Sequence, residues 1–340
     1  MNERRNERHD WGTLNEVEPG LYRLRLFNPR GALMINTWIY QGPAGFVVID
    51  PGWPWTRDGL AAALTRLGTS VAGVGAWLYT HTHVDHMGLA AWLGSQSDAP
   101  HITWSGVAPY LETWHSFQDR TNDWSDWGRS AFDEPARSTM LKMWEDSRRS
   151  RPFKGLVDEF GEMSVRNAEL YDIGQTIQVE DLALTVIDAR GHDPHHIAFF
   201  DDARGWLFSG DVILPAATPI SRAMGDDLDA YEASIERLAV LNTQLLLPGH
   251  GIQRSDRIAQ AFDRSRGFVA DFEASVWRVL ETAPEPIDLF SLAIATTPDG
   301  KPPAASTTWW VHLSNLDAHL RRGVTRGNFV EFAGPRYALA

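Results

Sequence analysis

The sequence contains no cysteine. This absence excludes disulfide bonds and thiolate ligands, which are the usual contributions of cysteine to stability and to metal binding. Any metal site in the chain must therefore be built from histidine imidazoles and from carboxylates. The candidates for such a site are the 12 histidines and the 44 acidic residues.

Basic side chains are also scarce, because 31 Lys and Arg residues stand against 44 Asp and Glu residues and leave a formal net charge of −13. Affinity for nucleic acids depends mainly on lysine and arginine, so this balance argues against a nucleic-acid partner. The sequence also lacks an apolar run long enough to span a membrane, and its charged start at residues 1–10 lacks the apolar segment of a signal peptide. We therefore expect a cytoplasmic protein without membrane association.

The distribution of apolar residues predicts an α+β fold. Short segments rich in β-branched and aromatic residues, separated by turns with Gly and Pro, occur within residues 21–50 and again within residues 171–214. A segment with helical spacing of apolar residues follows each block. Two strand-rich blocks that are each closed by helices favour an αββα sandwich over residues 19–254, preceded by a polar tail at residues 1–18.

Two segments depart from this plan. Residues from about 102 to 168 are polar, rich in tryptophan and helical in their spacing, so we expect an inserted helical lid there. Residues 255–340 predict three helices followed by a hairpin, which is the order of a winged-helix module, and we expect a small winged-helix-like domain. Tryptophan side chains exposed on either segment would favour a homodimer.

The strongest chemical signal is the sequence THTHVDHMG at residues 80–88, directly after an apolar segment. His81 and His83 lie two residues apart on an extended stretch, so both imidazoles face the same side and can bind one cation. Asp85 and His86 follow at the start of a predicted helix and are directed toward a second cation. The alternative, a solvated polar loop, leaves four metal-binding groups within six residues unexplained.

This segment resembles the HxHxDH signature of the metallo-β-lactamase superfamily. Other signature motifs of that family are matched in the expected order, each at the end of a predicted strand. They are VIDPG at residues 48–52, GHDPHH at 191–196, FSGD at 208–211 and LPGHG at 247–251. The resemblance implies a metallo-β-lactamase domain at residues 19–254. The C-terminal part of the chain, which includes WWVHL at residues 309–313, resembles the winged-helix tail of a lactamase-like hydrolase subgroup.

The family pattern implies two metal ions and assigns their ligands. The first ion would be bound by His81, His83, His192 and Asp211, and the second by Asp85, His86, His250 and Asp211. Two zinc ions are the implied cofactors, with iron or manganese as alternatives that the same ligand types accept. Asp50 would support the site by accepting a hydrogen bond from a ligand histidine. Its alternative role is to cap the Pro-Gly turn that follows it.

Four further side chains are candidates for contacts with the substrate. Trp53 and Trp55 lie at the expected rim of the site and would form the wall of a pocket for an apolar or aromatic substrate. Alternatively, they anchor the lid on the sandwich. The pocket interpretation predicts that Trp53→Ala changes substrate affinity more than melting temperature. His195 and His115 are the other candidates, each with a structural role as the alternative, and His196 is expected to be structural.

The predicted reaction is hydrolysis of a small molecule. Two metal ions about 3.5–4 Å apart would hold a bridging water as hydroxide and polarise the scissile group, while Asp85 orients this nucleophile and accepts its proton. We expect an ester, thioester or lactone substrate. The alternatives are a phosphodiesterase or endoribonuclease, a β-lactamase-like amide hydrolase, and a non-catalytic binding protein. Residues 256–340 carry 9 basic and 10 acidic side chains, which argues against the nuclease, and the complete ligand set argues against the binding protein.

Overall fold

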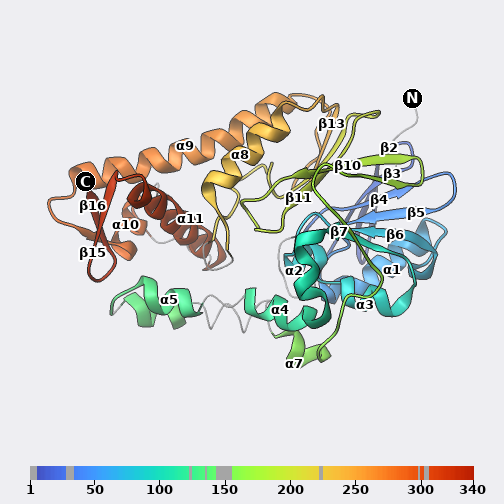
Figure 1. Cartoon of the computed structure of the whole chain (residues 1–340), viewed down its shortest axis with the longest axis horizontal. Coiled ribbons are helices and arrows are strands. Elements are labelled where there is room, and N and C mark those ends of the chain that lie inside the picture. Colours follow the sequence, from blue (N-terminus) through green and yellow to red (C-terminus); the bar gives the residue numbers. More distant parts are fainter. Residues whose placement is uncertain are drawn as a thin grey trace.

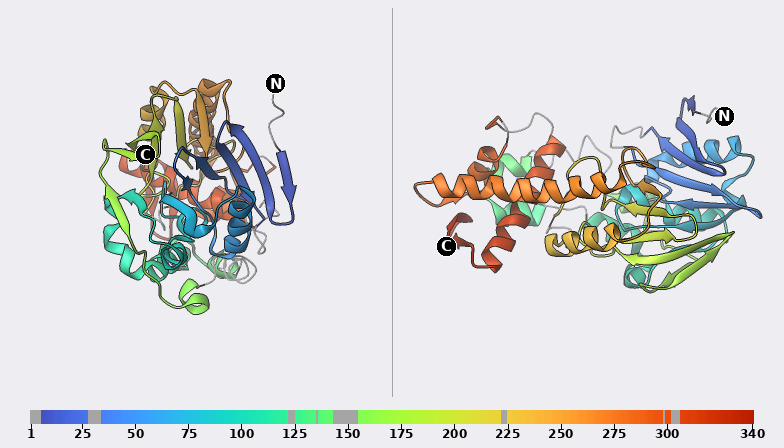
Figure 2. Two further views of the ribbon diagram at one scale, coloured as in Figure 1. Left: turned by 90° about the vertical axis from the view of Figure 1, so that its right-hand side faces the viewer. Right: turned by 90° about the horizontal axis from the view of Figure 1, so that it is seen from above.

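The structure of the protein is a computed structural model that describes residues 6–27, 34–121, 125–134, 136–142, 155–221, 225–297, 299–301 and 306–340. Figure 1 shows an elongated molecule with a β-rich body at one end and the C-terminal helices and hairpin at the other. The long helix α9 (Ile258–Thr282) runs from the body to the far end and connects the two parts, as the view from above in Figure 2 also shows.

One half of the body is an eight-stranded sheet whose strands follow one another in chain order. Its members are β1 (Asn6–His9), β2 (Gly12–Glu18), β3 (Leu21–Leu26), β4 (Thr37–Gln41), β5 (Phe46–Ile49), β6 (Val74–Leu78), β7 (His101–Trp104) and β8 (Ala168–Tyr171). Pairing is antiparallel from β1 to β5 and parallel from β5 to β8. Because parallel strands end at the same edge of a sheet, the loops after β5 and β6 lie side by side.

The other half is a five-stranded sheet with strand order β13-β12-β11-β10-β9. These strands are β9 (Thr176–Val179), β10 (Leu182–Asp188), β11 (Ile197–Asp201), β12 (Trp206–Gly210) and β13 (Leu245–Pro248). Alternate side chains of each sheet face the other sheet, since the side chains of a strand point to opposite faces in turn. The core between the sheets contains Trp38, Ile49 and Leu78 from the first sheet and Leu184, Phe199 and Phe208 from the second.

Helices cover the outer face of both sheets. On the first sheet, α1 (Arg57–Arg66) and α3 (Ala90–Gln96) share a buried cluster with the outward side chains of the strands. On the second sheet, α8 (Leu228–Ala239) and the first half of α9 do the same. Short helical elements in the connecting loops are η1 (Pro54–Thr56), η2 (Val71–Gly73) and α2 (Val84–Met87). This layering confirms the predicted α+β fold with an αββα sandwich.

Helix α8 illustrates how the sequence specifies these covering helices. It begins after Asp227, whose side chain accepts a hydrogen bond from the backbone N–H of Ala230 and thereby caps the first turn. Its buried residues recur every three or four positions, at Leu228, Tyr231 and Ile235, so one apolar stripe faces the sheet. The result is a helix that holds Tyr231 against the loop after β12.

The prediction of a polar tail at residues 1–18 is wrong for residues 6–18, because this stretch contains β1 and β2 at the edge of the first sheet, and residues 1–5 lie outside the described part of the chain. Strand β2 buries Leu14 and Val17, which are three residues apart rather than two. The register of β2 against β3 shifts between Glu16 and Glu18, and this irregularity accounts for the spacing. The irregular register therefore interrupts the alternation of buried and exposed residues by which a strand is recognised in a sequence.

The insert is helical, but its predicted bounds of about 102–168 include residues of both flanking strands, β7 and β8. Its described helices are η3 (Ser105–Thr113), α4 (Trp114–Thr121), α5 (Ser125–Ala131), residues 136–142 and α7 (Leu156–Phe160). These pieces pack in two places. Val107 and Trp114 join the outer core of the first sheet, whereas Phe132 and Met140 join the core of the C-terminal part. The insert thus connects both ends of the molecule (Figure 1).

The C-terminal part contains three helices and a hairpin in the predicted order. After α9 come β14 (Ile287–Asp288), α10 (Leu289–Ala295), α11 (Ser306–Thr325), β15 (Phe329–Phe332) and β16 (Arg336–Leu339), and the strands form a sheet of order β14-β16-β15. Helix α9 lies wholly within the expected C-terminal domain of residues 255–340, yet its first half packs on the sandwich through Phe262 and its second half packs in the C-terminal core through Val276. None of the described helices is both long and apolar enough to cross a bilayer.

Candidate metal centre

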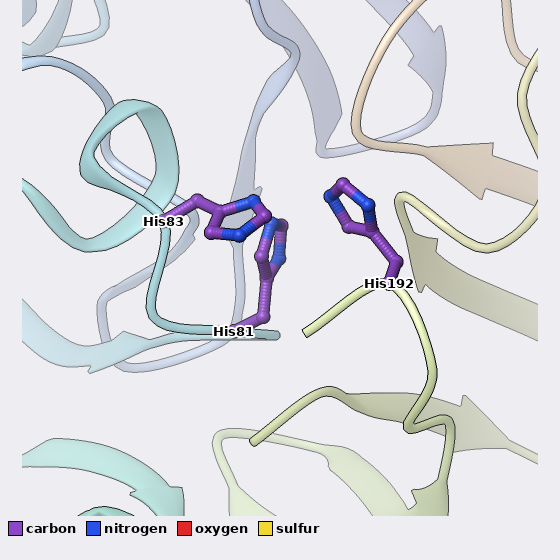
Figure 3. Close-up of side chains that lie close together, drawn as sticks. All are labelled: His81, His83 and His192. Atoms are coloured by element: carbon purple, nitrogen blue, oxygen red, sulfur yellow. The ribbon is translucent and has the colours of Figure 1, made fainter. Parts of the chain in front are cut away.

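The seven predicted metal ligands come from loops at one edge of the sandwich. They follow β6 (His81 to His86), precede β11 (His192), and follow β12 (Asp211) and β13 (His250). Figure 3 shows the rings of His81, His83 and His192 gathered around a common space. The possible ligand atoms lie within 4.8 Å of one another in three sets, which are His81/His83/His192, His81/His86/Asp211 and Asp85/His86/His250. The fold therefore brings the predicted residues together.

Asp211 lies between the two predicted sites. Its Oδ2 is 3.6 Å from His192 Nε2, which belongs to the first set, and 3.2 Å from His250 Nε2, which belongs to the second. Its Oδ1 is 3.5 Å from His86 Nε2. Asp85 completes the second set, with its Oδ2 3.4 Å from His250 Nε2. This is the placement expected of a carboxylate shared by two cations.

Unsatisfied buried atoms show that these residues fit metal ions. Nε2 of His81, His86 and His192 is buried without a hydrogen-bond partner, and so is Oδ1 of Asp211. Buried polar atoms are nearly always paired, so several unpaired atoms that face one space indicate a site for cations. The loop at Gly249 keeps this space open, because a Cβ there would collide with Asp211 Oδ1 and crowd His86 Cε1.

The second ring nitrogen of four ligand histidines is held by a neighbouring oxygen. The pairs are His81 Nδ1 with Thr80 Oγ1 at 3.0 Å, His86 Nδ1 with Asp50 Oδ2 at 3.0 Å, His192 Nδ1 with Pro219 O at 2.7 Å and His250 Nδ1 with Met34 O at 3.1 Å. Such contacts fix the orientation of each ring and leave Nε2 for the metal.

Asp50 makes the contact that the sequence predicted, a hydrogen bond from a ligand histidine. Its Oδ2 accepts from Nδ1 of His86, and its two oxygens also accept from the backbone N–H and the hydroxyl of Thr80, each at 2.8 Å. Asp50 therefore ties the end of β5 to the start of the HxHxDH loop. The residue has a positive φ of 53°, a conformation that Asp tolerates better than most side chains.

The electrostatics divide the histidines into two groups. Burial lowers the pKa of His250, but the carboxylates of Asp211 and Asp85 outweigh burial and raise it to about 10. Burial also lowers the pKa of His86, but the neighbouring carboxylates outweigh this effect and raise the pKa well above its usual value. In contrast, burial and the neighbouring His192 lower the pKa of His83 to about 4. Without metal, His86 and His250 are thus protonated at neutral pH, whereas His83 is neutral.

Two positioning residues were missed by the sequence analysis. Asp193 accepts hydrogen bonds from the backbone N–H of Thr82 at 2.7 Å and from that of His195 at 2.7 Å, so it fixes the segment between His81 and His83. Gln118 of α4 donates to the carbonyl of Thr82 from the insert. The signal for Asp193 was its place beside His192 in GHDPHH. Gln118 has no comparable signal.

His196 was expected to be structural, and its contacts show which parts of the site it supports. Its Nε2 accepts a hydrogen bond of 3.0 Å from the backbone N–H of Asp211, and its ring stacks on that of His81 at 4.5 Å. Burial lowers its pKa to about 3, which keeps Nε2 unprotonated and able to accept. His196 therefore holds both Asp211 and His81 in place.

His195 and His115, the predicted substrate contacts, make their observed contacts within the protein. Nδ1 of His195 lies 3.1 Å from Asp193 Oδ1, and its ring packs 5.1 Å from that of Tyr110. Nδ1 of His115 donates to the carbonyl of Gly161 at 2.6 Å inside the insert. These contacts agree with the structural alternative for each residue, and a role in substrate binding stays a prediction.

The contacts of Trp53 and Trp55 favour the anchoring interpretation. Trp53 is 3% exposed and forms a buried cluster with Val84 of α2 and Leu156 of α7. Trp55 is half-buried at the edge of this cluster, and its Nε1 donates to Glu159 Oε1 at 2.9 Å. The pair joins the metal-site loop to the insert.

Trp53→Ala is expected to lower the free energy of unfolding by about 3–5 kcal/mol, because a large buried side chain is lost and leaves a cavity. Denaturant unfolding followed by tryptophan fluorescence measures this loss, and steady-state kinetics on the same variant measures KM. Trp55→Ala serves as the matched variant and should cost less stability, since that ring is already partly exposed. A large rise in KM for Trp53→Ala without loss of stability would support the pocket interpretation instead.

A sequence model of the Metallo-beta-lactamase superfamily matches residues 30–250. The chain belongs to this superfamily. It is a metal-dependent hydrolase of the metallo-beta-lactamase fold, as the motifs predicted. The match ends at His250, the last predicted ligand, and leaves the C-terminal part outside.

Two relatives illustrate the range of superfamily members that the chain resembles. The probable metallo-hydrolase YqjP of Bacillus subtilis (strain 168) is 23% identical over 292 residues, which cover 77% of this chain and 80% of that protein. The thioesterase pkgB of Emericella nidulans is 31% identical over 78 residues, which cover 23% of this chain and 22% of the thioesterase.

Solved structures extend the likeness to the C-terminal part of this superfamily member. A beta-lactamase domain protein from Burkholderia ambifaria is 24% identical, with a TM-score of 0.75 over 97% of this chain and 95% of that one. A metallo-beta-lactamase family protein from Thermus thermophilus is 22% identical, with a TM-score of 0.68 over 96% of this chain and 100% of that one. The shared fold thus includes the helices beyond residue 250.

Proposed function

We propose that the protein is a dinuclear zinc hydrolase that cleaves an ester, thioester or lactone bond in a small molecule. The observation that carries this proposal is the position of the Asp211 carboxylate, between two sets of histidines whose Nε2 atoms face it. A single cation would leave one of these sets without a partner.

The residues divide between the ions as the family pattern implies. One zinc ion would be held by His81, His83, His192 and Asp211, and the other by Asp85, His86, His250 and Asp211. When bound, such a pair supplies an activated water at neutral pH and polarises the carbonyl group of the substrate. The ligand types suit zinc, since they combine imidazoles with carboxylates.

Asp85 would accept the proton of the attacking water. Burial raises its pKa, but His86 and His250 outweigh this effect and lower it below the usual value, so the carboxylate is ionised at neutral pH. Its Oδ2 lies 3.4 Å from His250 Nε2, which fixes this atom at the edge of the cluster. The side chain is partly exposed, so water and substrate can reach it.

A small carbonyl substrate is supported by two observations. The thioesterase that is similar to 78 residues of this chain provides a precedent for thioester chemistry in a protein of related sequence. The net negative charge of the chain favours such a substrate over a nucleic acid.

A substrate panel tests this proposal. Purified protein loaded with zinc is assayed on a chromogenic ester, a thioester, a lactone, a cephalosporin, a phosphodiester and RNA. We expect turnover of the first three, its loss after treatment with a chelator, and its return when zinc is added. Turnover that persists after complete metal removal would contradict the proposal. Cleavage of RNA alone, or of the cephalosporin alone, would replace the proposed substrate class.

A further inference from the structure

The loop that follows Asp211 contacts two of the predicted ligands. The carbonyl oxygen of Pro219 accepts a hydrogen bond of 2.7 Å from His192 Nδ1. One residue earlier, the hydroxyl of Thr218 donates to the backbone carbonyl of Asp211 at 3.0 Å. The conformation of this loop therefore bears directly on the direction in which His192 points.

The C-terminal helix α11 holds the same loop from the other side. Asn315 is 7% exposed, and its Oδ1 accepts a hydrogen bond of 2.8 Å from the backbone N–H of Ile220. The side chain of Ile220 is buried in the cluster that also contains Ala318 of α11. A residue 95 positions further along the chain thus fixes the loop beside the metal centre.

Both hydrogen bonds belong to a single peptide group. The carbonyl of Pro219 and the N–H of Ile220 are the two ends of one planar unit, and in a trans peptide they point in opposite directions. His192 Nδ1 donates to one end, and Asn315 Oδ1 accepts from the other. Because the unit is rigid, tilting one end tilts the other, and the two hydrogen bonds in series also polarise one another.

The helix that carries Asn315 is itself fixed to the sandwich. Arg322 lies seven residues further on the same face of α11, and its side chain is only 4% exposed. Its guanidinium donates to Glu273 of α9 at 2.8 Å and to Glu232 of α8. Helix α11 therefore has a defined position against the body and can serve as a fixed support.

We propose that Asn315 is a positioning residue for the metal ligand His192, and that it acts through the peptide group between Pro219 and Ile220. The C-terminal part would then help to orient a ligand of the metal centre, although all predicted ligands lie within residues 30–250. This inference rests on the proposed function, since it requires that His192 bind zinc.

The choice of variant follows from a cavity next to Asn315. The cavity measures about 20 Å³ and is lined by Thr218, Ile220, Asn315 and His319 among others. Such a volume holds about one water molecule, so water entering an Asn315→Ala variant would replace the missing acceptor. Asn315→Leu keeps the branched shape of the side chain, excludes water and removes the acceptor. Asn315→Asp keeps an oxygen at the position of Oδ1.

The experiment measures zinc affinity of the full chain by competition with a chromogenic chelator. We expect Asn315→Leu to bind one of its two zinc ions about tenfold more weakly, which is the lower end of the range for losing support of a metal ligand. Asn315→Asp should restore most of this affinity. Leu316→Ala is the matched control, because Leu316 is fully buried in the C-terminal core and belongs to a different face of α11. It should lower the melting temperature and leave zinc affinity unchanged.

Two results would overturn the inference alone. In the first, Asn315→Leu binds both zinc ions as tightly as the unaltered protein does. In the second, Leu316→Ala weakens zinc binding as much as Asn315→Leu, which would reduce the effect to general loss of stability. If the unaltered protein bound no zinc, the proposed function would fail and the inference with it.

Discussion

Asp211→Ala is expected to remove zinc binding and hydrolysis together. The carboxylate lies within 3.6 Å of ring nitrogens from both predicted sites, so its loss takes a ligand from each. Loss of a residue that only supports a ligand already costs about 10–100-fold in metal affinity or activity, so loss of a shared ligand should cost more than about 100-fold. The remaining histidines would also lack the negative charge that favours two cations side by side.

Zinc content after gel filtration and turnover of the best substrate of the panel measure this effect. Asp201→Ala is the control, because Asp201 is also a fully buried aspartate, at the far end of β11, where it accepts hydrogen bonds from Arg204. That variant should be less stable yet keep its zinc and its kcat per folded molecule. An Asp211→Ala protein with the zinc content and the activity of the unaltered protein would refute a shared carboxylate.

The positions of the ligands and of Asp50 could be predicted because the family motifs that contain them stand next to strands that the apolar pattern also marks. Asp50 ends β5, the HxHxDH loop ends β6, and Asp211 ends β12. Parallel pairing of β5 with β6 and of β12 with β13 then places these ends at one edge. The assignment of the ligands came from the resemblance to the family motifs, and this parallel pairing was not predicted, whereas the sandwich and its covering helices followed from the apolar periodicity.

Contacts between distant segments were not predictable in this way. Gln118 reaches Thr82 from the insert, and Asn315 reaches Ile220 from α11, yet neither residue differs in the sequence from any polar helix residue. Their roles depend on how helices dock, which is set by many weak apolar contacts and not by a local pattern. For the same reason, the sequence did not predict that the first half of α9 packs on the sandwich while its second half packs in the C-terminal core.

The boundaries of the first sheet were missed for a local reason. Leu14 and Val17 are the apolar residues that β2 buries, and the irregular register between them breaks the alternation that identifies a strand. The winged-helix interpretation of the C-terminal part, the homodimer and the cytoplasmic location stay predictions.

Zinc affinity of the metal-free protein is expected to rise between pH 6 and pH 8, much more steeply for one of the two ions than for the other. The pKa of His250 is raised to about 10 and that of His86 is also well above its usual value, so both rings must lose a proton before they bind the second ion. Each displaced proton adds roughly a factor of ten in affinity per pH unit, or about 100-fold for two. His81 and His83 have lowered pKa values and are already neutral, so they release no proton and affinity for the first ion should rise less steeply with pH.

Calorimetric titration with zinc in buffers of different ionisation enthalpy measures the released protons. We expect about two protons for one ion and fewer for the other. The same groups affect stability, because the folded pKa of His250 lies above its unfolded value of about 6.5. Its contribution to the stability of the metal-free protein is therefore complete below pH 6.5 and is lost as the pH rises through about 10. In the zinc-loaded protein the Nε2 proton of this ring has already been displaced, so the melting temperature of that form should not show this decline. Equal pH dependence for both ions would contradict the division of the histidines into two groups.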